Sequence, residues 1–490
     1  MPHISLKKEP RLEAKHQAFV FQVEAFMAVR DSTYAAIFHE QGLGKSKIAI
    51  DLMHYWLSTK QADTILFVVK KGLLRNWEKE FAIHSYIKPK ILTQDRSSNY
   101  YVFNSPARLL LTHYEVLRSE LDRLSLFLKT RDVAVVFDES TKIKNPESSL
   151  TKAAFSLAPL FKKRFIMTGT PVANRPYDIW AQIWFLDQGK SLGNDFSEFK
   201  RQSDLSNDLV QYIQKQEQLE AFLAGIFERI AAFVVRETKE TAGILLPEKV
   251  VQRVVCDWET RQYDLYRSVQ TEMRAVVIRD GIPTEDHSEE ILKRMLRLVQ
   301  IASNPRLVDQ GYRCSPGKLE YLSDIVSRVC SNGEKCIVWT AFTENVDWLT
   351  QELRSYGTRK VHGRLDMRQR DHAIKCFMED PEIHVLIATP GAAKEGLTLT
   401  VANHVIFYDR TFSLDDYLQA QDRIHRISQY RKCFVYNLIM SDSIDEWVEI
   451  LLESKRLAAQ LTQDDISRDH YRDQMSYDFG LIIRRILGIK

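Results

Sequence analysis

The chain has 490 residues, with 44% hydrophobic, 27% charged and 10% aromatic side chains. This composition is ordinary for globular proteins, so it excludes collagen-like, low-complexity and broadly disordered classes. The length predicts roughly three folding units. The net charge of +3 neither requires nor excludes a nucleic-acid partner.

The cysteines and the hydropathy of the sequence exclude several further classes of protein. All six cysteines lie in the second half of the chain and none forms a CxxC pair, so neither a zinc site nor a disulfide framework is expected. No stretch approaches the roughly 20 apolar residues of a membrane span. The N-terminal residues also lack the apolar core of a secretory signal. These features predict a cytosolic protein with reduced thiols.

Short apolar runs recur in the first third of the chain, separated by polar turns and by helix-like stretches such as Ser46–Ser58. Runs of this length are typical of strands buried on both faces of a parallel sheet. Their alternation with helices predicts a doubly wound α/β lobe. The predicted strands are Ala35–Phe38, Thr64–Val69, Arg108–Leu111, Ala134–Phe137 and Arg164–Met167.

The same alternation returns later and predicts a second α/β lobe, while the sequence between the lobes is charged and helix-favouring. The expected organisation is a first lobe at 1–185, a helical insertion and linker at 186–314, a second lobe at 315–455 and a terminal helix in a C-terminal tail at 456–490. The strands predicted in the second lobe are Lys335–Trp339, Arg359–His362, Val385–Ala388, His404–Tyr408 and Cys433–Leu438.

The strongest local signal is the Gly-rich turn that follows the first predicted strand and opens a helix. Such a turn lets backbone N–H groups approach phosphate oxygens. Lys45 would reach the β- and γ-phosphates of ATP, and the Ser46 hydroxyl would ligate Mg²⁺. His39 replaces the usual first glycine of the GxxxxGK[ST] pattern, so a turn that merely begins a helix stays the alternative. The residues expected to bind nucleotide are Gly42, Leu43, Gly44, Lys45 and Ser46.

An acidic pair ends another predicted strand, in Val135-Val-Phe-Asp-Glu139. Asp138 would hold Mg²⁺, and Glu139 would orient and deprotonate the attacking water. Most Asp-Glu pairs are solvated caps. The position at the tip of an otherwise apolar strand favours the catalytic interpretation, because carboxylates are rarely placed there without a role.

Two further patterns complete the set. Thr168, Gly169 and Thr170 follow the last predicted strand of the first lobe, where they could sense the state of the acidic pair. In the second lobe Arg423 and Arg426 are three residues apart, which predicts that they share one helical face. There they could neutralise charge on the γ-phosphoryl group as arginine fingers. In isolation, a solvated basic helix face remains the simpler interpretation.

The order of these motifs over two lobes, with the stretches around them, resembles the Swi/Snf-type DNA translocases of helicase superfamily two. The resemblance runs through most of residues 10–455, and the spacing around Gly396 is similar to that of the annealing-helicase subgroup. The additional stretches that carry it are Leu73-Leu-Arg-Asn-Trp-Glu-Lys-Glu-Phe81, Thr112-His-Tyr114, Asp138-Glu-Ser-Thr-Lys-Ile-Lys-Asn145, Val235-Arg-Glu-Thr-Lys239 and Gln419–Gln429 with its His-Arg-Ile-Ser-Gln.

The resemblance implies two RecA-like lobes that use ATP and Mg²⁺. It also implies double-stranded DNA held across them by backbone contacts without sequence specificity. Gln17 sits where the family has its adenine-reading glutamine, Gly396 would join the nucleotide-binding set, and Gln419 would couple nucleotide to DNA with the Thr-Gly-Thr turn. The expected DNA contacts are Lys71, Thr112, Lys144, Arg364 and Lys394.

The expected function is ATP hydrolysis that moves the protein along duplex DNA or remodels protein–DNA or branched DNA complexes. Two alternatives stay open: a strand-separating DNA or RNA helicase, and an ATP-switched subunit of a larger defence or repair complex.

The chain departs from the family pattern at Thr141, where the acidic box usually has His, and at Lys70, which is usually Pro. A minimal bacterial or phage motor in the cytoplasm is expected, or a nuclear one in a eukaryote.

Overall fold

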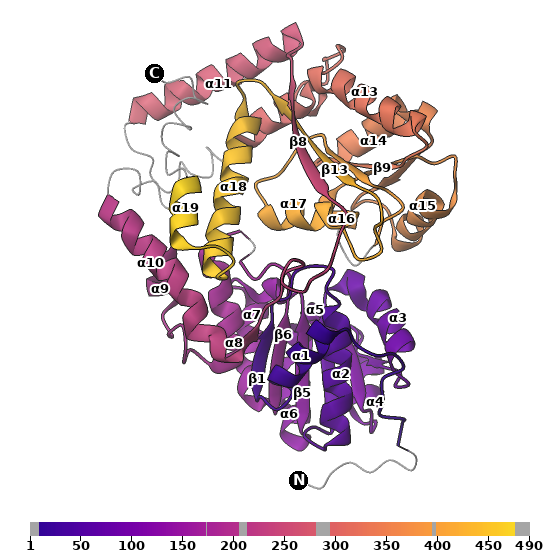
Figure 1. Cartoon of the computed structure of the whole chain (residues 1–490), viewed down its shortest axis with the longest axis vertical. Helices are drawn as coiled ribbons and strands as arrows, with labels where there is room; N and C mark the ends of the chain where they lie inside the picture. The colour runs from indigo at the N-terminus through magenta and orange to yellow at the C-terminus, as the bar shows by residue number, and fades with distance from the viewer. Residues whose placement is uncertain (1–8, 173, 205–212, 281–294, 394–397, 476–490) are drawn as a thin grey trace. The chain divides into compact units, whose positions relative to one another are not determined.

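The computed structural model describes residues 9–172, 174–204, 213–280, 295–393 and 398–475 (Figure 1). They fall into two compact units. The first unit is built from the chain up to residue 204, from 214–245 and from 458–473, and the second from 246–457. Each unit is organised around its own parallel sheet.

The described residues of the first unit form a seven-stranded sheet in the order β3-β4-β2-β5-β6-β1-β7, and every strand pair is parallel. All residues of β2, β4 and β6 are buried, as the apolar runs predict for strands covered on both faces. The strands are β1 Tyr34–Ile37, β2 Thr64–Val69, β3 Lys90–Ile91, β4 Leu109–His113, β5 Val133–Asp138, β6 Lys163–Met167 and β7 Val234–Val235.

Helices connect these strands as right-twisted parallel sheets require. The helices in chain order are α1 Val20–Val29, α2 Lys45–Ser58, α3 Leu74–His84, α4 Arg96–Phe103, α5 Tyr114–Ser119, α6 Leu121–Thr130, α7 Ser149–Leu157, α8 Trp180–Asp187, α9 Phe196–Ser203 and α10 Ile213–Ile230.

The second unit has a six-stranded parallel sheet in the order β10-β11-β9-β12-β13-β8. Alternate residues of its central strands enter two separate apolar cores: Val338 and Ile387 lie in one, Ile337 and Leu386 in the other. The sheet is therefore covered on both faces. The elements are β8 Lys249–Cys256, α11 Thr260–Asp280, α13 Gly317–Ser331, β9 Cys336–Trp339, α14 Thr343–Glu352, β10 Thr358–Val361, α15 Met367–Glu379, β11 Val385–Ala388, α16 Pro390–Ala393, β12 His404–Phe407, α17 Leu414–Gln421 and β13 Cys433–Met440. The helix α18 Ile444–Thr462 begins in this unit and ends in the first, to which nearly all of α19 Arg468–Gln474 belongs.

The expectation of two doubly wound parallel-sheet lobes is confirmed, and each predicted strand is present within one or two residues of its predicted bounds. The structure adds three edge strands, β3, β7 and β8, that the apolar runs did not indicate. The segment 186–314 supplies β7 to the first sheet and β8 to the second, so it contributes to both units as well as being helical. The helix α18 crosses the expected boundary at residue 455, and residues 476–490 of the expected tail lie outside the described part of the chain.

Within the described ranges, no helix combines the length and the apolar character needed to cross a membrane.

Candidate functional site

The Gly-rich turn between β1 and α2 has the backbone of a phosphate loop. Gly42 and Gly44 have φ values of 89° and 69°, a region that glycine adopts readily and other residues do not. The helix α2 begins at Lys45, directly after the turn. The Lys45 ammonium donates to the carbonyl of His39 at 2.9 Å and to that of Glu40 at 3.3 Å. The loop and its lysine thus form one connected polar unit.

His39, at the position of the usual first glycine, is fully buried beside this loop. Burial, with the nearby charges of Lys45 and Arg236, lowers the pKa of His39 to about 3. The ring is therefore neutral at physiological pH, and it adds bulk to the loop without adding charge.

The acidic pair lies at the carboxyl end of β5, held by two aromatic side chains. The Trp77 indole N–H donates to Asp138 Oδ2 at 2.8 Å, and the Tyr114 hydroxyl donates to the Asp138 carbonyl at 2.8 Å. Burial and repulsion from Glu139 raise the pKa of Asp138 to about 7. Glu139 has a φ of 53°, and its Oε2 accepts no hydrogen bond from the described residues, with Lys70 Nζ 3.9 Å away. Asp138 is thus fixed in place, whereas one oxygen of Glu139 is available to a further donor.

The Thr-Gly-Thr turn follows β6, and it packs directly against the phosphate loop. A Cβ placed on Gly169 would lie 2.5 Å from Gln41 Cγ and 3.3 Å from Lys45 Nζ. The amide of Thr168 donates to the Ile37 carbonyl at the end of β1. Only a residue without a side chain lets the turn approach the lysine this closely.

A glutamine that the sequence did not single out joins the acidic box to this turn. Gln182, on α8, is fully buried; its Oε1 accepts from the Ser140 hydroxyl at 2.7 Å, and its Nε2 donates to the Pro171 carbonyl at 2.8 Å. Ser140 follows the acidic pair and Pro171 follows the turn, so Gln182 bridges the two motifs. A single polar residue inside an apolar helix was the only sequence signal for it.

Two glutamines of the N-terminal region differ in their surroundings. Gln17 is exposed and lines a cleft of about 570 Å³ together with Phe26, Met27 and Lys47. Gln22, near the start of α1, is buried and donates to the Leu43 carbonyl at 3.1 Å. The sequence placed Gln17 at the nucleotide, and the structure adds Gln22 as the glutamine that contacts the phosphate loop itself.

The candidate arginines of the second unit do not share a helical face, so that expectation is wrong. The helix α17 ends at Gln421, and both residues follow in turns. Arg423 Nε donates to the Gln419 carbonyl and Arg426 Nε to the Asp422 carbonyl, each at 3.0 Å. These guanidinium groups satisfy carbonyls at and just after the end of α17, which its own backbone leaves without helical partners.

Gln419, expected to couple nucleotide to DNA, is bonded within its own helix. It is buried, and its Nε2 donates to Asp415 Oδ1 at 2.6 Å, one turn earlier in α17.

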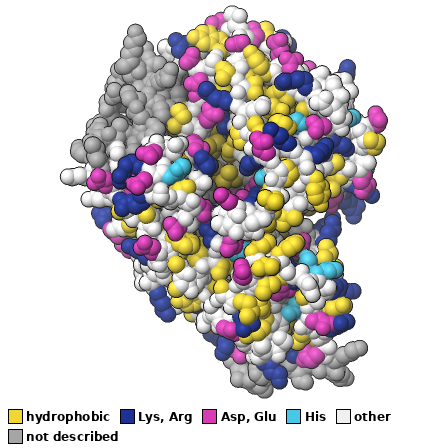
Figure 2. All heavy atoms as spheres, in the orientation of Figure 1, with side chains coloured by type: hydrophobic (Ala, Val, Ile, Leu, Met, Phe, Trp, Pro, Cys, Tyr) yellow, Lys and Arg dark blue, Asp and Glu magenta, His cyan; other side chains and the backbone are white. Residues whose placement is uncertain are grey.

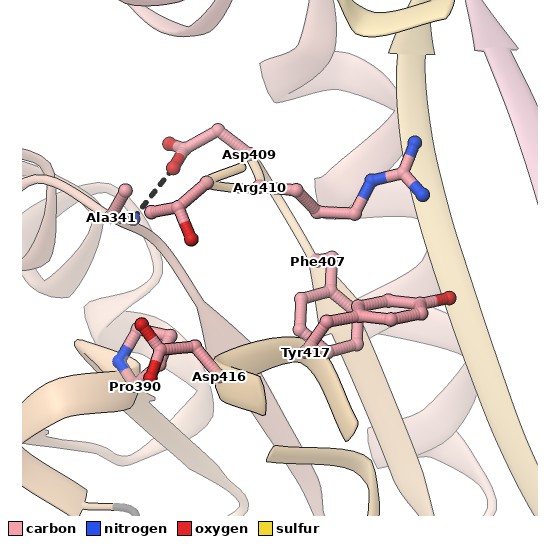
Figure 3. Close-up of a pocket in the computed structure, with 8 residues that line it drawn as sticks. Ala341, Pro390, Phe407, Asp409, Arg410, Asp416 and Tyr417 are labelled. Carbon is pink, nitrogen blue, oxygen red and sulfur yellow. Dashed lines mark hydrogen bonds between the residues drawn. The ribbon is translucent and has the colours of Figure 1, made fainter. Parts of the chain in front are cut away.

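A small cavity of about 10 Å³ lies beyond the ends of strands β9, β11 and β12, lined by Ala341, Pro390 and Asp409 among others (Figure 3). Asp409 is buried and accepts hydrogen bonds from the Thr340 hydroxyl and the Ala341 amide, each at 2.6 Å. Burial raises the pKa of Asp409. The volume is about that of one water, and the bonds of Asp409 tie the segment after β12 to the segment after β9.

The expected DNA contacts differ in their surroundings. Lys71 is exposed just after β2. Lys144 pairs with Asp178 at 3.0 Å, and Arg364 pairs with Glu344. Thr112 is fully buried and its hydroxyl donates to the Leu92 carbonyl, so the structure contradicts a phosphate contact by this side chain. Two expected residues, Lys394 and Gly396, lie outside the described part of the chain.

On the face drawn in Figure 2, lysine and arginine side chains are interspersed with aspartate and glutamate. No cluster of three or more His, Cys, Asp or Glu side chains suited to a metal ion occurs among the residues that the structure describes.

Comparison with known proteins identifies the family. A model of the SNF2-related domain matches residues 21–307, more than half of the chain. A model of the helicase conserved C-terminal domain matches residues 317–428. The chain belongs to the SNF2 family. It carries an SNF2-related domain followed by a helicase conserved C-terminal domain.

Individual SNF2 relatives are distant. An uncharacterized ATP-dependent helicase of Mycoplasma genitalium is 27% identical over 91% of this chain and 42% of the relative. The ISWI chromatin-remodeling complex ATPase of Saccharomyces cerevisiae is 24% identical over 84% of this chain and 37% of the relative. The chain thus spans less than half the length of these curated relatives. The SWI2/SNF2 ATPase core of Sulfolobus solfataricus in complex with dsDNA is 25% identical and covers 96% of this chain and 99% of that chain, with a TM-score of 0.42.

Proposed function

We propose that this SNF2-family chain is an ATP-dependent translocase on double-stranded DNA. The observation that carries the proposal is the meeting of three motifs at one sheet edge. Strands β5, β6 and β1 are neighbours, so the acidic pair, the Thr-Gly-Thr turn and the phosphate loop follow three adjacent parallel strands. Ligands of doubly wound sheets bind at this carboxyl edge.

In the first unit, separate residues would bind the phosphates of ATP and activate the attacking water. Lys45 exchanges the carbonyls of His39 and Glu40 for the β- and γ-phosphates, and the amides of the loop bind the phosphate oxygens. Glu139, with one oxygen that accepts no hydrogen bond from the described residues, orients the attacking water and takes its proton.

The donor set also fits a magnesium ion. Ser46 supplies a hydroxyl at the head of α2, and Asp138 is a carboxylate that the Trp77 indole holds in one orientation. Mg²⁺ bound there would neutralise charge on the transferring phosphoryl group. The adjacent cation would also keep Asp138 ionised despite its raised pKa.

Residues outside the first unit complete the proposal. Arg423 and Arg426 would supply positive charge to the γ-phosphoryl group, with Gln419 and the Thr-Gly-Thr turn coupling nucleotide to DNA. Lys71, Lys144 and Arg364 would contact the DNA backbone, which gives binding without sequence preference. The names of two relatives, an ATP-dependent helicase and a chromatin-remodeling ATPase, agree with this class of activity.

The test is the ATPase rate measured without nucleic acid and then with single-stranded, duplex and forked DNA and with RNA. We expect the greatest stimulation by duplex DNA, and the Lys45→Ala and Glu139→Gln variants to abolish it. Displacement of a third strand from a triplex would report movement along the duplex. A wild-type protein that binds no DNA at low salt, where phosphate contacts are strongest, would overturn the proposal.

The same measurements separate the alternative functions. Separation of a partial duplex would favour a helicase, as the name of the Mycoplasma relative suggests. Tight ATP binding with no stimulated turnover would favour an ATP-switched subunit, for which Thr141 in the acidic box provides a sequence reason.

A further inference from the structure

The C-terminal segment of the chain is packed onto the first unit. Residues 458–473 belong to that unit, although α18, from which they continue, begins within the second. Tyr471 of α19 is fully buried, and Arg472 Nη2 lies 2.7 Å from Glu220 Oε2 on α10. Glu220 is itself buried, so the segment is anchored by an apolar and a charged contact.

A second charged contact of this segment leads to the phosphate loop. Asp465, between α18 and α19, forms a two-pronged ion pair with Arg236, with Nε and Oδ1 2.6 Å apart. The side chains are only 11% and 16% exposed, so the pair is shielded from water. A planar guanidinium held by both carboxylate oxygens has a fixed orientation.

Arg236 also contacts the backbone where the phosphate loop begins. Its Nη1 donates to the Phe38 carbonyl at 2.7 Å. The amide of Phe38 donates to the Val235 carbonyl and the amide of Glu40 to the Glu237 carbonyl, each at 2.8 Å. Residues 235–239 therefore run alongside the first part of the loop and hold it.

The residue after Phe38, His39, supplies a carbonyl that accepts a hydrogen bond from Lys45. A shift of the Phe38 carbonyl would therefore move the backbone that positions Lys45. The contacts run without a gap from Asp465 through Arg236 and Phe38 to Lys45.

We infer that Asp465 is a positioning residue for the ATP site: by orienting Arg236 it fixes the start of the phosphate loop, so that nucleotide affinity depends on the Asp465 carboxylate. The inference rests on the proposed function, because it assumes that the loop binds ATP. Neither Asp465 nor Arg236 touches the reacting atoms. The two residues are 229 positions apart in the sequence.

The test compares Asp465→Asn with the conservative Asp465→Glu and with Arg472→Ala. Asn keeps the size of the side chain and removes its charge, Glu keeps the charge, and Arg472→Ala removes the other ion pair of the same segment. We expect Asp465→Asn to raise the Kd of a fluorescent ATP analogue about three- to tenfold, the range of coupling expected for a residue outside the site. The kcat at saturating ATP should change less than twofold. Asp465→Glu should recover most of the affinity, and Arg472→Ala should stay within twofold of the wild type.

Hydrogen exchange of the loop amides, residues 38–46, provides a readout that needs no ATP. We expect faster exchange in Asp465→Asn than in Arg472→Ala. Equal effects of these two variants on both readouts would show that docking of the segment matters and that the Asp465 carboxylate has no special role, which overturns the inference. Unchanged affinity in Asp465→Asn would overturn it as well.

A double variant that reverses the pair, Arg236→Asp with Asp465→Arg, tests whether the ion pair alone is sufficient for ATP affinity. The reversed pair keeps opposite charges but offers no donor to the Phe38 carbonyl, so it should not restore affinity; full restoration would contradict the role of Arg236. If the wild-type protein itself fails to bind ATP, the proposed function fails. If the wild type binds and Asp465→Asn binds equally well, only this inference fails.

Discussion

The two units share one architecture but differ in how their candidate residues are held. In the first unit Lys45, Asp138 and Gly169 lie at the ends of adjacent strands, and Trp77 and Gln182 hold the surrounding motifs in place. In the second unit Arg423 and Arg426 are bonded to carbonyls at the end of their own helix. The first unit thus gathers its motifs at the ends of three neighbouring strands, whereas the Nε groups of the two arginines donate to carbonyls of their own chain segment. Lys45 is likewise bonded to the carbonyls of its own loop.

The largest expected effect is a loss of turnover when an arginine of the second unit is replaced. Replacing Arg423 or Arg426 by Ala should lower kcat by roughly 10³-fold, the lower end of the range for an arginine finger. The Kd of ATP should change little, because the phosphate loop lies in the first unit. Single-turnover ATPase and analogue binding measure the two quantities. The exposed Arg431, replaced by Ala, is the matched control, and an equal loss of binding and turnover would indicate a purely structural role.

The next effect concerns the acidic pair of the first unit. Glu139→Gln should reduce kcat by about 10²-fold, the lower end of the contribution of a positioned general base. ATP binding should persist, since the amide keeps the shape of the side chain. Steady-state kinetics with filter binding of ATP tests this, and the exposed Glu147→Gln should behave as the wild type. A variant that hydrolyses ATP at a tenth of the normal rate or faster would exclude Glu139 as the base.

A smaller effect is expected where the turn meets the loop. Gly169→Ala should raise the KM for ATP about tenfold, because its methyl group would displace Gln41 and Lys45 from their positions. Gly225→Ala is the control: a Cβ there meets nothing within 4 Å and the residue lies in α10, so the change should be neutral or slightly stabilising. If both variants have a normal KM, the contact between turn and loop has no part in nucleotide binding.

The smallest effect distinguishes the two glutamines. Gln22→Ala removes one hydrogen bond to the loop, worth about 1 kcal/mol, and should weaken ATP and GTP about fivefold alike. Gln17→Ala should reduce only the preference for ATP over GTP, if the cleft beside Gln17 receives the base. Competition between the two nucleotides measures both effects, and a loss of preference in Gln22→Ala alone would reverse the assignment.

Local sequence patterns were enough to locate the first unit's motifs. Apolar runs located β2, β5 and β6 because strands buried on both faces must be apolar throughout. Gly44 and Lys45 were found because a tight turn before a helix needs those residue types. The same reasoning failed for Arg423, because an i, i+3 spacing predicts a shared helical face only while the helix continues, and here it ends at Gln421.

Contacts over long separations had no local signal. Trp77 and Asp138 are 61 positions apart, and Ser140 and Gln182 are 42 apart. Trp77 lies in a stretch that carries the family resemblance, but nothing in that stretch indicates Asp138 as its partner. Thr112 looked like a surface hydroxyl at a strand end, yet in the folded sheet it is covered and bonded to Leu92.

The sequence by itself determined two doubly wound lobes, the phosphate loop and the acidic pair, because hydrophobic periodicity and turn chemistry depend on neighbouring residues. Tertiary structure alone decided which side chains hold that chemistry in place. Trp77, Gln182 and the Asp465–Arg236 pair act across the fold, and their partners are set by how strands and helices pack. That packing depends on the whole chain, so no local stretch of the sequence reveals it.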